Sequence, residues 1–384
     1  MKIVYCIDTV TRLGGIEIVT IAKANALAQI PGNQVWLALA NNDHSVITRL
    51  KNVSILDLAV HYNENDDKGG YLHAMLDYMK KRRLHRKRLE PLLNDIRPDI
   101  VISTGMSAKK FLPTLKIKSN PVFIREVHFF RLYRSKQAHS IHEWVAAKIG
   151  ELRDYGVTIR RYDKIVVLTD AEKVGPWANW DKVVTIPNPI PNREKAHSTC
   201  THKVAITAGR LMWVKNLEAL VNIWAKVIQR HPDWTLQIWG EGDMKRNIEE
   251  QIGRLGLKEH VFLMGYTSEV QEKMAEASIF VMTSRTEGFS LVTTEAMSVG
   301  IPTVAYNCLG GISHVVKDGV TGFLVPMNDE DAFVEKVCAL IEDEERRVEM
   351  GQAALREAEQ YGIEKITQRW MELFHELLTK KENK

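Results

Sequence analysis

The sequence predicts an α/β protein of two domains, each built on a parallel sheet with helices on both faces. Three observations support this prediction. The chain has 384 residues, which is more than a single hydrophobic core ordinarily holds. Short β-branched runs alternate with segments of helix length along the whole chain. A polar, proline-rich interruption at residues 185–202 divides this alternation into two halves.

The first half contains apolar runs with the length and composition of buried strands. They are residues 2–7, 34–40, 99–103, 121–127 and 164–169. Segments of helix length, such as 16–29 and 71–93, separate them. Strands that alternate with helices form right-handed βαβ units, so these runs predict one parallel sheet.

The second half repeats this design and ends in a helix. Its predicted strands are residues 203–209, 235–240, 261–265, 278–284 and 302–306. The final segment, 361–378, places Ile366, Trp370, Leu373, Phe374 and Leu377 on one helical face. We therefore expect an N-terminal domain at 1–187 and a second domain at 188–361. A C-terminal helix at 362–384 is expected to pack back on the N-terminal domain.

Composition limits the class of protein. The 45% hydrophobic and 26% charged residues are typical of a soluble globular chain. Cys6, Cys200, Cys308 and Cys338 are scattered and form no Cys-x-x-Cys pair, which argues against a disulfide scaffold or a zinc site. The first residues lack a signal-peptide pattern, and no run of about twenty apolar residues occurs. These features predict a cytoplasmic protein.

The charge is unevenly distributed. The first 190 residues hold 29 Lys and Arg against 19 Asp and Glu, and the remainder holds 23 against 29. The densest basic run extends from Lys80 to Arg88, next to Leu72, Met75, Leu76 and Met79. Such runs are usually solvated helix faces, but this one also fits reversible contact with an anionic membrane. No nucleic-acid-binding signature accompanies it, so a nucleic-acid partner is not expected.

Several turns stand where open α/β sheets bind ligands, at the carboxyl ends of strands. Gly14 and Gly15 precede a helix and allow an anion to approach the backbone, although such turns also occur for steric reasons alone. Arg210 and Lys215 follow the first strand of the second half and could clamp a diphosphate. Two solvated cations are the alternative interpretation. The Gly-x-Gly turn in "WGEGDMK" lacks the third glycine of the dinucleotide fingerprint.

Four ordered motifs, "GGIE", "GRLMWVKN", "TEGFSLVTTEAMSVGIPTVAY" and "GGISHVVKDGVTGFLVP", resemble the retaining glycosyltransferases of family 4. The resemblance covers nearly the whole chain and is strongest from 203 to 326. It implies the GT-B architecture, in which two Rossmann-like domains face each other across a cleft. It also implies a hexosyltransferase that retains the anomeric configuration and uses a nucleotide diphosphate sugar as co-substrate. No cofactor and no metal are implied.

The resemblance assigns roles to individual residues. Glu295 matches the glutamate that binds the ribose hydroxyls, and Glu287 matches the one near the donor sugar. Arg210 and Lys215 match the diphosphate-binding cations, and Gly265 and Tyr266 match the loop that meets the base. The expected donor-binding set is Gly14, Gly15, Arg210, Lys215, Gly265, Tyr266, Glu287, Gly288, Phe289, Ser290, Leu291, Val292 and Glu295. The expected catalytic set is His128, Glu287, Arg210 and Lys215.

His128 ends a predicted strand where members of the family often carry a histidine near the reacting sugar. A structural histidine is the alternative. Arg125 and Glu126 are weaker candidates that could pair with each other. His314 stands where the family often has glutamate, which leaves the preferred sugar open. The Asp-x-Asp pattern at 329–331 formally fits a metal site, but a helix capped by Asn328 explains it better.

The expected donor is a UDP sugar, on a loose likeness of "NCLGGIS" to members that use one. The expected acceptor is a sugar or a lipid-linked sugar in the synthesis of cell-surface polysaccharide or glycolipid, which would place the enzyme at the inner face of the membrane. Two alternatives remain. A UDP-sugar epimerase can share this fold, and a two-lobed binding protein without catalysis would need no Arg/Lys clamp.

Overall fold

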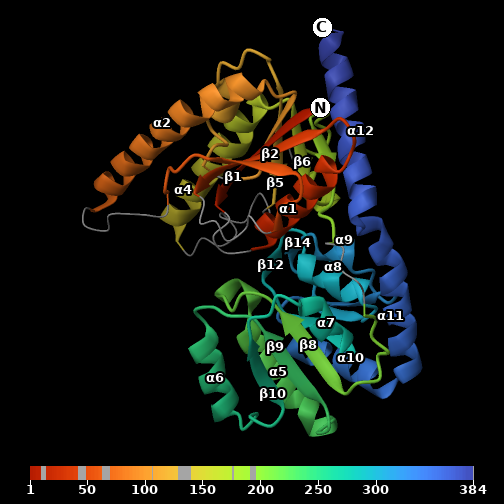
Figure 1. Ribbon diagram of the computed structural model, residues 1–384. Helices are drawn as coiled ribbons and strands as arrows, with labels where there is room; N and C mark the ends of the chain where they lie inside the picture. The colour runs from red at the N-terminus through yellow and green to blue at the C-terminus, as the bar shows by residue number, and fades with distance from the viewer. Residues whose placement is uncertain are drawn as a thin grey trace. The chain divides into compact units, whose positions relative to one another are not determined.

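The computed structural model describes residues 1–9, 14–41, 49–62, 70–105, 107–128, 140–174, 177–190 and 196–383 (Figure 1). The chain forms two compact units. The first consists of Met1–Leu168, Lys173–Pro191 and Ile363–Lys384, and the second consists of Thr169–Glu172 and Asn192–Gly362. Each unit contains one large parallel sheet, which confirms the predicted α/β class.

The sheet of the first unit has seven strands in the order β3-β2-β1-β4-β5-β6-β7. The strands are β1 (Lys2–Thr9), β2 (Gln34–Asn41), β3 (Val53–Asp57), β4 (Ile100–Ser103), β5 (Val122–Val127), β6 (Lys164–Val167) and β7 (Val183–Thr185). All neighbours pair in parallel. The order reverses direction between β1 and β4, and such a switch point is where open α/β sheets bind ligands.

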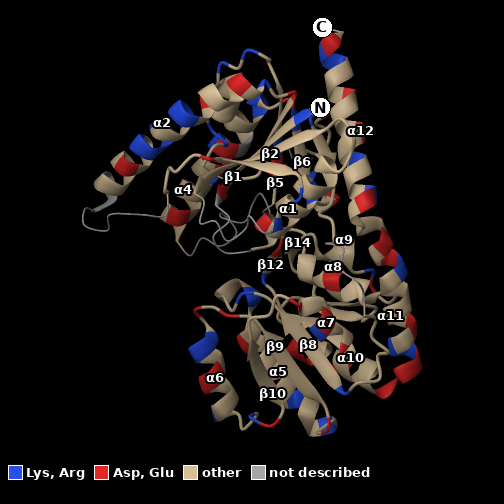
Figure 2. Ribbon diagram, viewed as in Figure 1, with Lys and Arg blue, Asp and Glu red and all other residues tan. Residues whose placement is uncertain are grey.

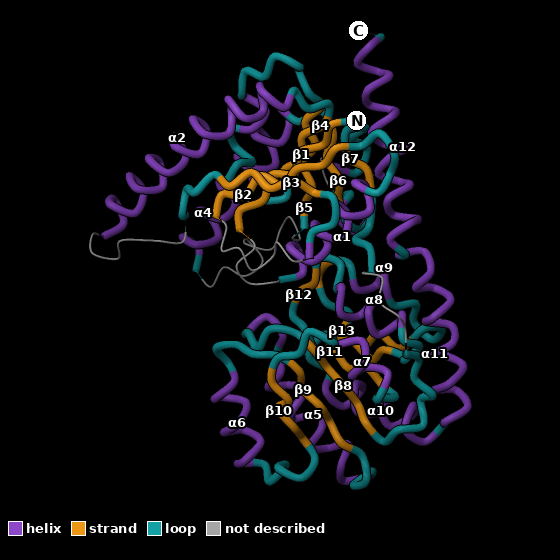
Figure 3. The backbone as a smooth tube through the Cα atoms, in the orientation of Figure 1, coloured by secondary structure: helices purple, strands orange, loops and turns teal. Residues whose placement is uncertain are grey.

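Helices cover both faces of this sheet (Figure 3). They are α1 (Gly15–Ala28) and α12 (Ile363–Glu382) on one face and α2 (Gly70–Ile96) on the other, whereas α4 (Ile141–Glu151) contributes no described side chain to either hydrophobic core. Successive side chains of a strand point to opposite faces. Tyr5 of β1 accordingly packs in the core formed with α1 and α12, whereas Val4 packs in the core formed with α2.

The C-terminal helix α12 belongs to the first unit although it follows the second in sequence. Its buried residues include Ile366, Trp370, Leu373 and Phe374, which lie in one core with Leu27 of α1. Four large apolar side chains on one face explain why the chain returns to this unit. No described helix is long and apolar enough to cross a membrane.

The sheet of the second unit has six parallel strands in the order β10-β9-β8-β11-β13-β15. They are β8 (Val204–Ala208), β9 (Thr235–Trp239), β10 (Val261–Gly265), β11 (Ile279–Met282), β13 (Thr303–Tyr306) and β15 (Gly322–Val325). The helices are α5 (Leu217–Arg230), α6 (Lys245–Arg254), α7 (Val270–Ala275), α8 (Leu291–Ser298), α9 (Ile312–Val315), α10 (Glu330–Glu342) and α11 (Glu344–Ala358). A separate pair of short strands, β12 (Thr286–Glu287) and β14 (Leu309–Gly310), completes the unit.

The Asp-x-Asp pattern at 329–331 forms the start of α10. Asp329, and not Asn328, is the capping residue, because its side chain accepts a hydrogen bond from the backbone N–H of Ala332 at 3.0 Å. Asn328 precedes it with φ of +64°, a left-handed conformation that asparagine tolerates. Glu330 and Asp331 lie in the first turn, where their negative charge interacts favourably with the partial positive charge of the helix N-terminus.

Candidate functional site

The carboxyl ends of β8, β9 and β10 meet at one edge of the second sheet. The N–H of Gly209 donates to the carbonyl of Trp239 at 2.9 Å, and the N–H of Gly240 donates to the carbonyl of Gly265 at 2.7 Å. Gly240 has φ of +137°, and a Cβ there would lie 1.9 Å from the Gly209 carbonyl oxygen. Only glycine permits this approach, so the turn noted as a weak dinucleotide signal has a packing role.

Lys215 and Glu287 form an ion pair at this edge. The Lys215 Nζ lies 2.8 Å from Glu287 Oε1, and both side chains are mostly buried, with 22% and 12% exposed. Lys215 ends a 3-10 turn, Trp213–Lys215, that directly precedes α5. Its Cε lies 3.3 Å from the position that a Cβ on Gly209 would take. The lysine therefore lies beside the end of β8, partly accessible to an anion.

The loop that carries Lys215 is held by the segment after β11. The Thr283 hydroxyl donates to the carbonyls of Lys215 and Asn216 at 3.2 and 3.0 Å. The Arg285 guanidinium donates to the Asn216 side chain at 2.6 Å and lies over the Trp213 ring, 4.6 Å from its centroid. These contacts fix the direction in which Lys215 leaves the backbone.

Glu287 is positioned by the β12–β14 pair. The N–H of Gly311 donates to the Glu287 carbonyl at 3.0 Å. Gly310 has φ of +115°, and a Cβ there would lie 1.7 Å from the same carbonyl oxygen. A side chain at 310 would therefore displace the strand that carries Glu287.

The next residues lead into α8. The centroid of the Phe289 ring lies 5.3 Å from that of Tyr361. Ser290 has φ of +57°, and its hydroxyl lies 2.7 Å from that of Thr293. The Phe289 and Ser290 side chains are buried, so only the backbone groups of these two residues could contact a ligand. Leu291 begins α8, as predicted, and Glu295 lies in its second turn with its side chain partly exposed.

Arg210 and Tyr266 are the exposed members of this edge. Arg210 follows β8, and its side chain forms no hydrogen bond or ion pair with any described residue. Tyr266, directly after β10, is 62% exposed. A pocket lies at the ends of β8, β9 and β11, with Gly209, Lys215, Trp239 and Ser284 in its lining. Of the predicted side chains, Lys215 lines this pocket, while Arg210, Glu287 and Tyr266 lie elsewhere on the same edge.

The remaining predicted residues belong to the first unit. Gly14 precedes α1 in an extended conformation, and the helix begins at Gly15. His128 directly follows β5 and is buried. The suggested pairing of Arg125 with Glu126 is wrong, because neighbours on a strand point to opposite faces. Arg125 donates to the Ser103 carbonyl and hydroxyl, whereas Glu126 pairs with Lys23 of α1.

The region of the chain that contains this edge matches a known family. Residues 191–357 fit the model described as "Glycosyl transferases group 1". This part of the chain is a group 1 glycosyl transferase domain. An uncharacterized glycosyltransferase of Haemophilus influenzae is 27% identical over 379 residues, covering 96% of this chain and 98% of the relative.

Further relatives share either one half of the chain or its fold. The poly(ribitol-phosphate) alpha-N-acetylglucosaminyltransferase of Staphylococcus aureus is 27% identical to this glycosyl transferase over 214 residues, which are 55% of this chain and 43% of that enzyme. The crystal structure of Anabaena HepE in complex with UDP-glucose aligns with a TM-score of 0.75 at 18% identity, covering 98% of this chain and all of the other. This likeness shows that the two proteins share the GT-B fold.

Sequence reasoning missed part of this edge. Thr283, Ser284 and Arg285 follow β11, and Ser284 lines the pocket with a buried hydroxyl that has no described hydrogen-bond partner. The rule that ligands bind where parallel strands end would have found them, since the strand at 278–284 was predicted.

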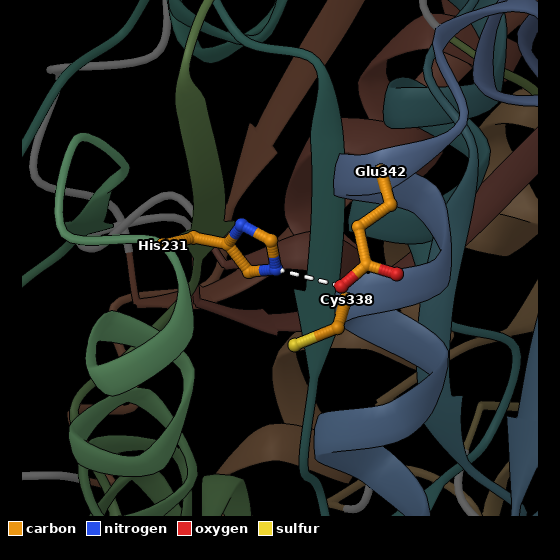
Figure 4. Close-up of side chains that lie close together, drawn as sticks. All are labelled: His231, Cys338 and Glu342. Carbon is orange, nitrogen blue, oxygen red and sulfur yellow. Dashed lines mark hydrogen bonds and ion pairs between the residues drawn. The ribbon is translucent and has the colours of Figure 1, made fainter.

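A possible metal-ligand set lies at the opposite edge of this sheet, before β9. His231 Nε2, Cys338 Sγ and a Glu342 carboxylate oxygen lie within 4.8 Å of one another (Figure 4). Arg230 already donates to that carboxylate at 2.9 Å, so a metal would have to displace a guanidinium. Burial raises the pKa of the Cys338 thiol to about 11, whereas a metal requires the thiolate. The cluster is better explained as an ion-pair contact between the end of α5 and α10.

Proposed function

We propose that this glycosyl transferase moves a hexose from a UDP sugar to an acceptor hydroxyl with retention of configuration and without a metal ion. The observation that carries the proposal is the Lys215–Glu287 pair beside the exposed Arg210 at the carboxyl edge of the second sheet. Cations on fixed loops at such an edge are suited to a diphosphate.

The chemistry follows from the charge that develops. The acceptor oxygen bonds to the anomeric carbon while the bond from that carbon to the diphosphate oxygen breaks. The acceptor proton passes to the departing phosphate oxygen, on the same face of the sugar. Lys215 and Arg210 stabilise the negative charge of the leaving group, and the N-terminus of α8 adds its partial positive charge. Glu287, paired with Lys215, is proposed to hold the donor sugar.

One observation favours a uridine nucleotide, and a second favours stacking on a base of any kind. HepE, which shares the fold, was crystallised with UDP-glucose. The exposed Tyr266 ring, at the end of β10, offers a flat apolar face to a base. For the acceptor we propose a sugar or a lipid-linked sugar in the synthesis of cell-surface polysaccharide or glycolipid. The name of the Staphylococcus relative, which acts on poly(ribitol-phosphate), supports a cell-surface product.

A thermal-shift comparison of nucleotides tests the donor site. We expect UDP and one UDP sugar to raise the Tm, because a ligand that binds only the folded state at a hundred times its Kd adds about 2.7 kcal/mol. Glu295→Ala should reduce the shift, and Glu249→Ala, an exposed position on α6, should not.

Turnover should persist in excess EDTA. Equal shifts with UDP, GDP and ADP, or turnover that requires added manganese, would contradict the proposal. Conversion of the UDP sugar without an acceptor would favour an epimerase.

We also propose reversible contact of the first unit with an anionic membrane through α2. Met75, Met79, Arg82, Arg83 and Arg86 recur at helical spacing along one face, and both methionines are 44% exposed. Figure 2 shows the density of basic residues along this helix. Not every cation of the basic run is available to a membrane, because Arg88 donates to the carbonyls of Leu58 and Ala59 at 2.7 Å.

Helix α4 supports the same proposal. Its exposed apolar residues recur three or four positions apart and form one stripe: Ile141, Trp144, Val145, Ile149 and Leu152 at its end. Lys148 lies 5.9 Å from the Trp144 ring. An apolar stripe with a tryptophan and a flanking lysine is typical of helices that lie in a membrane interface. Electrostatic attraction through α2 would then be combined with shallow burial of α4.

Sedimentation with vesicles tests this contact. The variant with Lys80, Arg82, Arg83 and Lys87 changed to Gln removes exposed cations that form no ion pair with a described residue. We expect it to bind vesicles containing phosphatidylglycerol up to about 10³-fold more weakly, since each basic residue contributes about 1 kcal/mol. A matched variant with Lys203, Lys226, Lys245 and Arg246 changed to Gln removes the same charge from the second unit. Equal losses in both variants, or binding that survives high salt unchanged, would contradict it.

A further inference from the structure

The core of the first unit contains an ion pair that the proposed chemistry does not use. Lys23 of α1 contacts Glu126 of β5 directly, and both side chains are only 1% exposed. The Lys23 ammonium also faces two aromatic rings, with its Nζ 5.1 Å from the Trp370 ring of α12 and 6.0 Å from the Tyr5 ring. Buried ion pairs seldom stabilise a fold more than apolar residues of the same size would, so this pair calls for another explanation.

Glu126 also faces His128. The His128 Nε2 lies 3.5 Å from Glu126 Oε1, the oxygen that Lys23 contacts, and the His128 side chain is 2% exposed. The imidazole therefore has a carboxylate on its Nε2 side. Both ring nitrogens of His128 are buried, and neither forms a hydrogen bond with a described residue, so only the carboxylate near Nε2 distinguishes them. A buried nitrogen without a partner is uncommon in a native protein, and it suits an atom that meets a ligand.

The charges around His128 balance so that its ring stays neutral. Burial lowers the pKa of His128, Glu126 opposes this, and Lys23 and Arg125 lower it further. Burial alone would raise the pKa of Glu126, but Lys23 and His128 bring it down to about 2. Burial lowers the pKa of Lys23, and Glu126 opposes that. The Lys23 ammonium and the Glu126 carboxylate are in direct contact, so their opposite charges compensate each other beside the imidazole.

We propose that Glu126 and Lys23 are positioning residues that orient His128 with Nε2–H toward Glu126 and Nδ1 free to accept a hydrogen bond from a sugar hydroxyl. Trp370 of α12 covers Lys23 and completes the arrangement. The identity of the ligand as a sugar rests on the proposed function. The orientation of the ring and the charge balance depend only on the described contacts in the first unit.

Nuclear magnetic resonance of histidine labelled with ¹⁵N and ¹³C tests the arrangement without any substrate. The His128 signal is identified by its loss in His128→Gln. We expect the wild type to show the Nε2–H tautomer and a His128 pKa below its ordinary value. Lys23→Met should raise this pKa, because it removes a cation that disfavours imidazolium. Glu126→Gln should lower it further, because it removes the anion that favours imidazolium, while its side-chain carbonyl can still orient the ring.

The matched control is a second buried ion pair of the same unit, Lys109 with Asp154 at 2.8 Å. Lys109→Met should destabilise the fold as Lys23→Met does but leave the His128 signal unchanged. If Lys23→Met does not fold, the double variant Lys23→Met/Glu126→Gln replaces both charges by neutral groups of similar shape and still reports the tautomer. An Nδ1–H tautomer in the wild type, or a His128 signal that responds equally to Lys109→Met, overturns the proposal.

Turnover gives a second readout. With the UDP sugar that raises the Tm, we expect Glu126→Leu to lower kcat by up to about 10²-fold through misplacement of the ring. The KM for the donor should change little, and Glu126→Gln should recover most of kcat. Equal losses in Glu126→Leu and Glu126→Gln overturn the positioning role. If no UDP sugar is bound or turned over by the wild type, the proposed function fails, and the resonance experiment still decides the role of Glu126 and Lys23.

Discussion

Replacing Lys215 by Met should lower the rate of sugar transfer by about 10²- to 10³-fold, the usual loss when one fixed group that stabilises developing charge is removed. The substitution keeps a long unbranched side chain, one atom shorter, and removes its charge. It also leaves Glu287 without the ion-pair partner that lies 2.8 Å away, so the donor sugar would lose an aligned carboxylate as well. Steady-state kinetics with a UDP sugar, together with the Tm, measure both effects.

Two further variants serve as comparisons for Lys215→Met. Arg210→Gln removes the second cation of the edge, which is exposed and forms no ion pair with a described residue, so its Tm should be unchanged while kcat falls. Lys226→Met removes an exposed cation that pairs with Asp331 at 2.7 Å on α10, and it should retain both kcat and Tm. Near-normal kcat in Lys215→Met would show that the diphosphate is stabilised elsewhere.

Trp370→Ala should destabilise the first unit by about 3–5 kcal/mol, the usual cost of removing a fully buried tryptophan side chain. Trp370 is 1% exposed and packs in one core with residues of β1 and α1. Hydrogen exchange should show lost protection in α12 and α1, because these helices contact each other through that core. The second unit should keep its protection.

An exposed position on the same helix provides the control for this prediction. His375→Ala changes a solvent-facing residue of α12, so it should shift the Tm by little. Trp224→Ala removes an equally buried tryptophan from the core of the second unit, and the loss of protection should then appear there. If Trp370→Ala behaves like His375→Ala, α12 does not contribute to the stability of the first unit.

Most strands with a continuous apolar sequence were predictable, and most short or interrupted ones were not. Strand β11 is fully buried along its length, so its sequence is a continuous apolar run that stands out from the segments around it. Strand β3 alternates between exposed and partly buried residues, and β7 has only three residues. Strands β12 and β14 have two residues each and exist only because the fold brings them together.

The candidate site was also predictable only in part: single residues could be assigned roles, but their pairings could not. Lys215 and Glu287 are separated by 72 residues and Lys23 and Glu126 by 103. No local pattern connects residues so far apart. Motif resemblance assigned roles to Lys215 and Glu287 one at a time, but their ion pair emerges only from the structure. Lys23 lies in a segment that is apolar on nearly all sides, and its burial depends on a C-terminal helix that follows more than three hundred residues later.

The return of α12 to the first unit has a consequence for recombination between relatives. A hybrid that joins the first 190 residues of one parent to the remainder of another would carry a foreign C-terminal helix against its own α1. Ile366, Trp370, Leu373 and Phe374 would then meet side chains that did not evolve with them. The first unit is therefore discontinuous in sequence. Shuffling that exchanges it as a working part must transfer the tail from residue 363 onward together with the N-terminal segment, by two crossovers.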